Sequence, residues 1–245
     1  MSSMIGGRSG NRGRCAQPCR QKYQMNGKET YLLSLKDICT LDLLPDILEA
    51  GICSLKIEGR MKRPEYAAGV TAIYRQALDQ ILDEKMPRNL KAPDQSGRKG
   101  IADWKERRKK DRQDLMDLYN RGGFCEGFYS GRKGPDMMAP ERPNHVGTPG
   151  AKVIAGGKLQ ALEELHTGDL LETENRGGSD SRHICVDADY AKGAILKLRV
   201  SAPKGSVLPR VRNEQLLGRI RENSDLAKCP IPVCGKARIT AGEPI

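Results

Sequence analysis

The sequence contains no run of about 18 consecutive apolar residues, the length that a membrane-spanning helix requires. Its first residues lead into a stretch rich in glycine and arginine, whereas a secretory signal peptide carries an apolar segment there. Both absences argue against membrane insertion and export, so we expect a cytoplasmic protein. In that compartment its eight cysteines should be reduced, which favours metal binding or buried thiols over disulfides.

Histidine is also scarce, because the chain contains only His145, His166 and His183. None of them stands at a spacing typical of zinc sites, and each is expected to be a surface or loop residue. The Walker and Rossmann phosphate-binding motifs are absent. No Ser/His/Asp or Cys/His arrangement has an interpretable spacing, so the sequence gives little support to a protease.

Aromatic residues make up 4% and hydrophobic residues 38% of the 245 residues, a composition typical of aliphatic cores with many loops. The length is enough for one large or two to three small domains. Lys+Arg total 42 against 31 Asp+Glu, a net charge of +11. The surplus indicates a polyanionic partner, most commonly nucleic acid. The alternative is a basic solvated surface, and nothing in the sequence indicates an obligate protein partner.

The stretch GGRSGNRGRCAQPCRQKY, residues 6–23, is expected to be a loop, because glycine is costly in helices and strands. It contains Cys15 and Cys19, and two thiolates so spaced are able to bind a metal ion or an iron–sulfur cluster. The alternative is a flexible tail with two incidental cysteines. The loop also contains four arginines, which would stabilise thiolates or attract phosphate: Arg8, Arg12, Arg14 and Arg20.

Two cysteines do not complete such a site, because structural zinc and most clusters take four protein ligands. No second close pair lies near the first, since Cys229 and Cys234 are far along the chain. The loop is therefore expected to be half of a site.

The next segments alternate between strand and helix patterns. We expect strands at 30–35 and 52–57, a helix over 40–50, and a long helix that begins at Pro64, where proline suits the first turn. This order predicts a βαβα unit with a parallel strand pair, the last part of a larger α/β barrel.

In parallel barrels the functional groups lie at the carboxyl ends of the strands. Here those residues are Lys56, Glu58 and Arg60. Glu58 is a candidate general base or a carboxylate that orients a cationic neighbour. The alternative is a surface ion pair in a loop.

Residues 86–147 are predicted to hold a linker, a polar helix over 103–120 and an irregular, ordered loop. Phe124 and Phe128 in this loop either stack on bases, together with the neighbouring cations, or anchor the loop to the core. Residues 148–212 alternate short apolar runs with glycine turns, which predicts a small all-β barrel or sandwich with a first hairpin turn at Gly156–Gly157. A short helix over 213–222 follows, and residues 213–245 are expected to begin a further α+β domain.

Several motifs carry a resemblance to a known family. NRGRCAQPCRQKY and YLLSLKDICTLDLLPDILEAGICSLKIEGRMKRPEYAAGVTAIYRQALD are similar to the peptidase U32 family, the collagenase-like proteases. The match is close over residues 4–85. The segment NRGGFCEGFYSGRKGPDMMAPERPNHVG and the β region after it resemble the longer members, of the ribosomal-RNA cytidine hydroxylase type.

The resemblance implies a TIM-type barrel followed by β-rich and mixed domains, and a [4Fe–4S] cluster held by four cysteines. Cys15 and Cys19 correspond to two of these ligands, and the other two precede the segment that aligns with Met1. The well-understood relatives are RNA or quinone hydroxylases, and the RNA-modifying ones are linked to prephenate. RNA is thus the expected substrate, with phosphate or substrate contacts from the loop arginines and Lys62, and with Glu58, Lys56 and Arg60 in the active site.

Against that family, the chain is expected to be a fragment. The expected divisions are the end of the barrel with its cysteine loop (1–85), the linker and loop (86–147), the β-barrel (148–212) and a truncated domain (213–245). Three functions stay open: part of an iron–sulfur-dependent RNA hydroxylase, a peptidase as the family name states, or an RNA-binding module without chemistry of its own.

Overall fold

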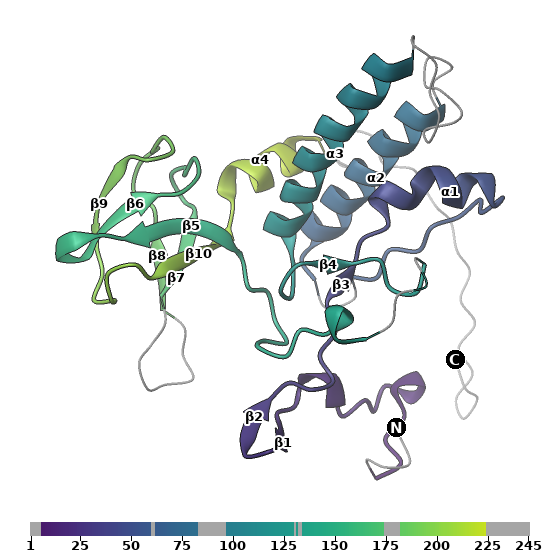
Figure 1. Ribbon diagram of the computed structural model, residues 1–245, viewed down its shortest axis with the longest axis horizontal. Coiled ribbons are helices and arrows are strands. Elements are labelled where there is room, and N and C mark those ends of the chain that lie inside the picture. The colour runs from purple at the N-terminus through teal and green to yellow at the C-terminus, as the bar shows by residue number, and fades with distance from the viewer. Residues whose placement is uncertain are drawn as a thin grey trace, which may run out of the picture.

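The computed structural model of the chain describes residues 6–59, 62–82, 97–129, 131, 134–173 and 182–223. It has mixed α/β architecture, with a helical part beside a curled antiparallel sheet (Figure 1). The helices are α1 Leu44–Glu49, α2 Pro64–Leu82, α3 Gly97–Leu118 and α4 Glu214–Asn223. The strands are β1 Tyr23–Met25, β2 Lys28–Thr30, β3 Asp37–Ile38, β4 Phe124–Cys125, β5 Thr148–Val153, β6 Lys158–Ala161, β7 Leu170–Thr173, β8 Arg182–Cys185, β9 Ile195–Arg199 and β10 Val207–Arg212.

The helical part is built on α2, which begins at Pro64 as predicted. Proline has no N–H to donate and its φ suits the first helical position. The apolar positions Val70, Ile73 and Ala77 are buried, and they pack in one cluster with residues of α1 and α3. Gly69 lets the helices approach closely, because a Cβ there would lie 2.7 Å from side-chain atoms of both α3 and α4.

The two predicted strands at 30–35 and 52–57 are wrong. Strand β2 ends at Thr30, and residues 52–59 form no strand. The alternation in ICSLKI has the period of a strand, but a strand also needs a hydrogen-bonded neighbour. No described segment pairs with residues 52–59, and Ile52 is 49% exposed.

The predicted parallel pair therefore does not form between those segments. The parallel pair that the structure describes joins β3 to β4, with Asp37 opposite Phe124 and Ile38 opposite Cys125. It links residues more than 80 positions apart, on either side of α2 and α3. Barrel units of TIM type do not form among the described residues.

Residues 148–212, the β domain, form a six-stranded antiparallel sheet in the order β8-β7-β10-β5-β6-β9, which confirms the predicted all-β region. Its inner face buries aliphatic side chains such as Leu159 and Leu171. The hairpin turn predicted at Gly156–Gly157 is confirmed. Both glycines have φ near +70°, and a Cβ on Gly157 would lie 2.5 Å from the Val200 carbonyl oxygen.

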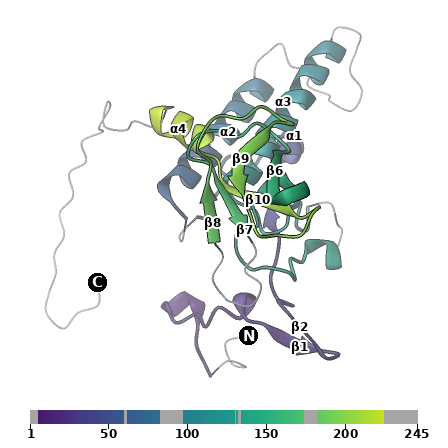
Figure 2. The ribbon, with the colours of Figure 1, turned by 90° about the vertical axis from the view of Figure 1, so that its left-hand side faces the viewer.

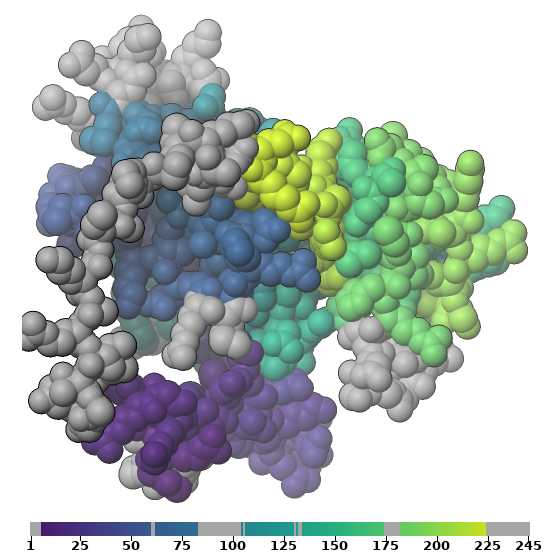
Figure 3. Space-filling view, turned by 180° about the vertical axis from the view of Figure 1, so that it is seen from behind, coloured from purple at the N-terminus to yellow at the C-terminus, as the bar shows by residue number. Residues whose placement is uncertain are grey.

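The two predicted helices after residue 100 are also confirmed, as α3, which begins earlier than predicted, and α4. Figure 3 shows that α4 lies between the helical part and the β domain. Phe124 packs against the helical core, whereas Phe128 is 69% exposed, so the two phenylalanines have different environments. The linker was predicted over 86–100, but residues 97–100 belong to α3, and residues 86–96 lie outside the described residues. Residues 224–245 of the further domain predicted over 213–245 also lie outside them.

Residues 6–23, the Cys loop, and the β1–β2 hairpin lie together at one end of the molecule in both Figure 1 and Figure 2. Backbone hydrogen bonds attach this end to the segment before the β domain, from the Tyr31 N–H to the Pro140 carbonyl and from the Lys36 N–H to the Met137 carbonyl, both 2.9 Å long. None of the helices in the described ranges is long and apolar enough to cross a membrane.

A buried charge network joins the helical part to the β domain. Arg210 of β10 donates to Asp117 of α3 at 2.6 Å and lies 3.4 Å from Asp169, which precedes β7. All three side chains are at most 8% exposed. Asp117 also accepts from Thr148 and Asn213, so its charge is fully hydrogen-bonded. This network fixes how the sheet sits on the end of α3.

Replacement of Arg210 by methionine is expected to lower the free energy of unfolding by about 3–5 kcal/mol, because two buried carboxylates lose their cation. Urea denaturation followed by circular dichroism measures this change. The matched control is Arg219→Met, whose ion pair with Asp114 is 3.5 Å long and 46% exposed on the arginine side. The control should cost less than about 1 kcal/mol, and equal losses in the two variants would contradict the assigned role of Arg210.

Candidate nucleic-acid interface

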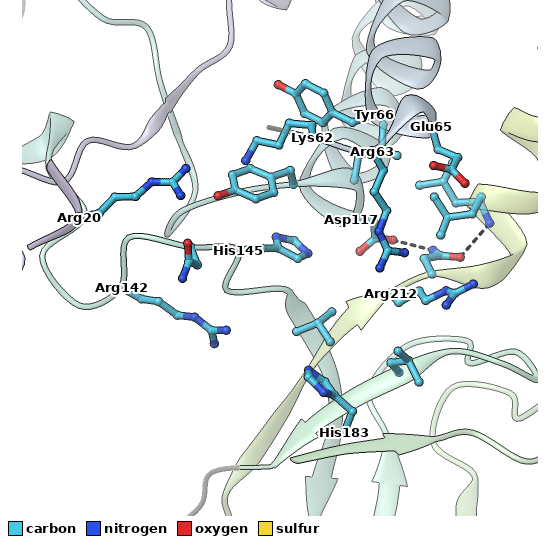
Figure 4. Close-up of a pocket in the computed structure, with 18 residues that line it drawn as sticks. Arg20, Lys62, Arg63, Glu65, Tyr66, Asp117, Arg142, His145, His183 and Arg212 are labelled. Carbon is cyan, nitrogen blue, oxygen red and sulfur yellow. Dashed lines mark hydrogen bonds between the residues drawn. The ribbon is translucent and has the colours of Figure 1, made fainter. Parts of the chain in front are cut away.

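A pocket of about 600 Å³ lies where the helical part, the β domain and the Cys loop meet (Figure 4). Its walls come from the N-terminal end of α2, the C-terminal end of α3, strands β7, β8 and β10, and α4. Arg20 enters from the Cys loop. The volume is in the range of small-molecule and nucleotide sites.

Three rings and a lysine form one side of this pocket. The ammonium of Lys62 lies over the ring of Tyr119, and that ring stacks on His145 with centroids 5.2 Å apart and planes at 19°. Tyr66 meets Tyr119 edge-on at 6.2 Å. A cation over an aromatic face is attracted by the ring quadrupole, so Tyr119 holds the position of Lys62.

Asn120 positions His145 in this stack. Its buried side-chain amide donates to the carbonyls of Met116 and Gly147, and its side-chain oxygen accepts from two backbone N–H groups of the following turn. Its backbone N–H donates to Nδ1 of His145 at 3.0 Å. Gly147 is required here because its φ is +74° and a Cβ would lie 2.5 Å from the Arg210 carbonyl oxygen.

Nδ1 of His145 lies 3.0 Å from the backbone nitrogen and 3.3 Å from the backbone carbonyl oxygen of Asn120, so the main chain of Asn120 holds the ring by this atom. Burial lowers the pKa of His145, and the charge of Arg142 acts in the same direction. The ring is therefore neutral at pH 7. Its Nε2 has no hydrogen-bond partner among the described residues.

Cations without an ion pair gather at the pocket. Arg20, Lys62 and Arg63 line it and form no ion pair within the described part of the chain. The other arginines of the wall are neutralised, since Arg142 pairs with Glu172 at 2.7 Å and Arg212 with Glu214 at 2.6 Å. The pocket thus carries uncompensated positive charge, which favours an anionic ligand.

The position of Lys62 also changes its protonation. Partial burial lowers the pKa of Lys62 to about 8, and the charges of Arg121 and Arg20 act in the same direction. Asp37 opposes this shift, but its carboxylate is engaged by Arg121 at 2.9 Å. Near pH 8 a large fraction of Lys62 is therefore an uncharged amine.

The Cys loop next to the pocket is irregular, as predicted. Gln17 between the two cysteines has φ +53°, in the left-handed region, and its N–H donates to Sγ of Cys15 at 3.3 Å. An N–H aimed at sulfur stabilises a thiolate ligand. Cys15 is exposed and Cys19 is half-buried, so both thiols are accessible.

These two thiols fit two positions of a metal or cluster site. Within the described ranges, no group of three or more Cys, His, Asp or Glu side chains is placed to hold a metal ion. The assignment of Cys15 and Cys19 as two of four ligands therefore stays a prediction.

The structure brings two of the predicted contact residues, Arg20 and Lys62, into the pocket. The other predicted arginines, Arg8, Arg12 and Arg14, are exposed on the Cys loop.

Of the predicted catalytic residues, the two that the structure describes, Lys56 and Glu58, do not line the pocket. Lys56 and Glu58 form an ion pair 2.9 Å long with side chains 86% and 74% exposed, the geometry of the surface-pair alternative. Arg60 lies outside the described residues. Their catalytic role is not tested by this geometry and stays a prediction.

Four pocket residues were not predicted to act there, and neither was Asn120, which holds one of them: Arg63, Tyr66, Tyr119 and His145. His145 is a loop residue, as expected, but its contacts are made across 25 positions to the end of α3. Local spacing carries no information about such contacts. The one available indication was charge, because Lys62 and Arg63 fall in a basic segment of the sequence.

Selective acylation tests the state of Lys62. At pH 8 with limiting acetic acid N-hydroxysuccinimide ester, Lys62 should react about tenfold faster than Lys56, because only an unprotonated amine is a nucleophile. Lys56 is the internal control, since its hydrogen bond and ion pair with Glu58 raise its pKa. Peptide mass spectrometry reports both rates, and a slower reaction at Lys62 than at Lys56 would contradict the lowered pKa.

A family model described as peptidase family U32 matches residues 1–139. A 23S rRNA 5-hydroxycytidine synthase of Escherichia coli is 35% identical over 176 residues, which are 67% of this chain and 25% of the relative. A collagenase of Porphyromonas gingivalis is 30% identical over 51% of this chain and 28% of its own. A tRNA hydroxylation protein of Bacillus subtilis is 37% identical over 32% of this chain and 22% of its own.

The chain thus spans about a quarter of the length of these curated relatives. No solved structure matches it.

Proposed function

The chain belongs to peptidase family U32, and we propose that it forms part of an RNA-modifying enzyme that hydroxylates a nucleobase. The observation that carries this proposal is the pocket with three unpaired cations beside an aromatic stack. Phosphate groups supply the matching negative charge in RNA. The names of two relatives, an rRNA 5-hydroxycytidine synthase and a tRNA hydroxylation protein, support RNA as the substrate class. An RNA substrate also favours the cytoplasm as the compartment.

In this proposal the described residues bind and orient the RNA. Arg20 and Arg63 contact backbone phosphates from two sides of the pocket, and Lys62 contributes a third positive charge. Nε2 of His145, which has no hydrogen-bond partner among the described residues, is available to a polar group of the ligand. The Asp117–Arg210 pair keeps the β-domain wall in register with the helical wall.

Cys15 and Cys19 would provide two of the four thiolates that hold a [4Fe–4S] cluster in the complete protein. The N–H of Gln17 stabilises the sulfur of Cys15, and the arginines of the Cys loop offset the negative charge of the thiolates. A cluster bound there would supply redox chemistry next to the pocket. Prephenate is the small co-substrate that we propose for the complete protein, and its carboxylates suit a cationic pocket.

We also propose that the β3–β4 pair belongs to an α/β barrel of TIM type in the complete protein. The pair is parallel, and Ile38 on β3 is 60% exposed, as expected for a strand that lacks its cover. In the complete protein Lys56, Glu58 and Arg60 would face the active site, as the family resemblance implies.

A peptidase is the second candidate, because one relative of the same family is named a collagenase. Glu58 would then be the acid/base group. This candidate predicts that the complete protein cleaves gelatin and that Glu58→Gln abolishes the cleavage. Intact gelatin after incubation with the wild-type protein would end it. If the complete protein bound RNA but modified no base, the third function, an RNA-binding module without chemistry of its own, would be supported.

The double variant Arg20→Gln/Arg63→Gln should weaken binding of a single-stranded RNA oligonucleotide about tenfold. The plot of log affinity against log salt concentration should become less steep by about one to two units, because two phosphate contacts are lost. Fluorescence anisotropy between 50 and 200 mM KCl measures both quantities. The control is Arg75→Gln, an exposed arginine of α2 that is already paired with Asp79. Unchanged affinity and slope in the double variant would refute the pocket as the RNA site.

A further inference from the structure

We propose that Lys62, with Arg20 near it, takes one phosphate of a bound RNA nucleotide, and that Tyr119 and His145 are the residues that position Lys62. The inference rests on the proposed function for the identity of its ligand. Its geometric basis is the contact of Lys62 with the aromatic stack and the absence of ion pairs for Lys62 and Arg20 within the described residues.

The ring of Tyr119 lies under the ammonium of Lys62 and stacks on His145. Because these contacts occupy the ring, we do not assign it to stacking on a nucleobase. The ring acts instead as a support that holds the ammonium at the pocket wall, with Tyr66 packed against its edge. A positioned ammonium with no carboxylate of its own is suited to a phosphate oxygen.

Within the described part of the chain, Lys62 has no carboxylate of its own to balance its positive charge. Asp37 is the carboxylate that acts on Lys62, but both of its oxygens accept hydrogen bonds from Arg121, at 2.9 to 3.3 Å. Arg121 and Arg20 repel the ammonium. The other titratable groups that face it, Tyr66, Tyr119 and His145, are neutral at pH 7. A bound phosphate would supply the charge that the protein does not.

The site should therefore depend on pH. Because the pKa of Lys62 is about 8 in the free protein and a bound phosphate favours the charged amine, the affinity should be constant below pH 8 and fall above it. Between pH 7 and pH 9 the expected loss is about tenfold, since the protonated fraction of a group with a pKa near 8 falls by that factor.

The test uses the 245-residue chain and a fluorescein-labelled, ten-nucleotide single-stranded RNA at constant ionic strength. The wild type should lose about tenfold in affinity from pH 7 to pH 9. Lys62→Arg should bind within about threefold of the wild type at pH 7 and lose the pH dependence, because arginine stays charged at both values. All other groups that titrate between pH 7 and pH 9 are still present in Lys62→Arg. Any pH dependence of the affinity that this variant loses is therefore due to Lys62.

Two further variants separate positioning from general stability. Tyr119→Phe keeps the ring and should retain the affinity and the pH profile of the wild type. Tyr119→Leu should weaken binding at pH 7 and move the loss of affinity to higher pH, because the ammonium returns to water. Lys192→Arg, a change at the exposed ion pair with Glu163 in the β domain, should leave both quantities unchanged.

The outcomes distinguish this inference from the proposed function. RNA binding with the same pH profile in the wild type and Lys62→Arg would overturn the phosphate site and leave the RNA function standing. If no RNA binds at any pH, cytidine monophosphate and cytidine are titrated by NMR. Binding of the monophosphate alone, with loss above pH 8, would support the site and overturn the RNA function, and binding of neither would overturn both.

Discussion

The position of the β domain depends on one buried cation, Arg210, which lies between Asp117 at the end of α3 and Asp169 before β7. An arginine in a dry interface is tolerated only when its charge is matched, and each carboxylate here accepts further hydrogen bonds that complete its shell. The geometry admits little adjustment, because a shift of the sheet would leave three charges unpaired. Asn120, three residues after Asp117, makes the adjoining contact that orients His145. The same stretch of chain therefore fixes both the domain interface and one wall of the pocket.

The two sides of the pocket differ in net charge. Arginines that come from the β-domain side are neutralised by neighbouring carboxylates, whereas the cations that come from the Cys loop and from the start of α2 are not. An RNA strand bound in the pocket would therefore contact unpaired positive charge on the side of the Cys loop and α2. On the β-domain side it would contact arginines that are already paired with carboxylates. The cysteines stand directly before Arg20, so a group bound by Cys15 and Cys19 would be close to whatever the cations hold. In the proposed function, a cluster bound by the two cysteines would therefore lie near the bound RNA.

Sequence patterns predicted the parts of this arrangement that depend on local rules. The start of α2 at Pro64, the glycine hairpin at 156–157 and the all-β region follow from backbone preferences and periodicity. The segment at 52–57 has the correct alternation but no partner among the described residues, and pairing is not visible in a local pattern. The pocket was only partly predictable. Charge density indicated Lys62, but the contact between His145 and Asn120 depends on a chain reversal that no motif encodes.

Cross-linking most directly tests whether the pocket holds an RNA nucleotide. A single-stranded RNA that carries one 4-thiouridine would be irradiated with the 245-residue chain, and the attached peptides would be identified by mass spectrometry. The account predicts attachment at pocket residues, Tyr66, His145 or His183. Attachment confined to Phe128 and Tyr129, which are 69% and 66% exposed on the loop outside the pocket, would contradict it.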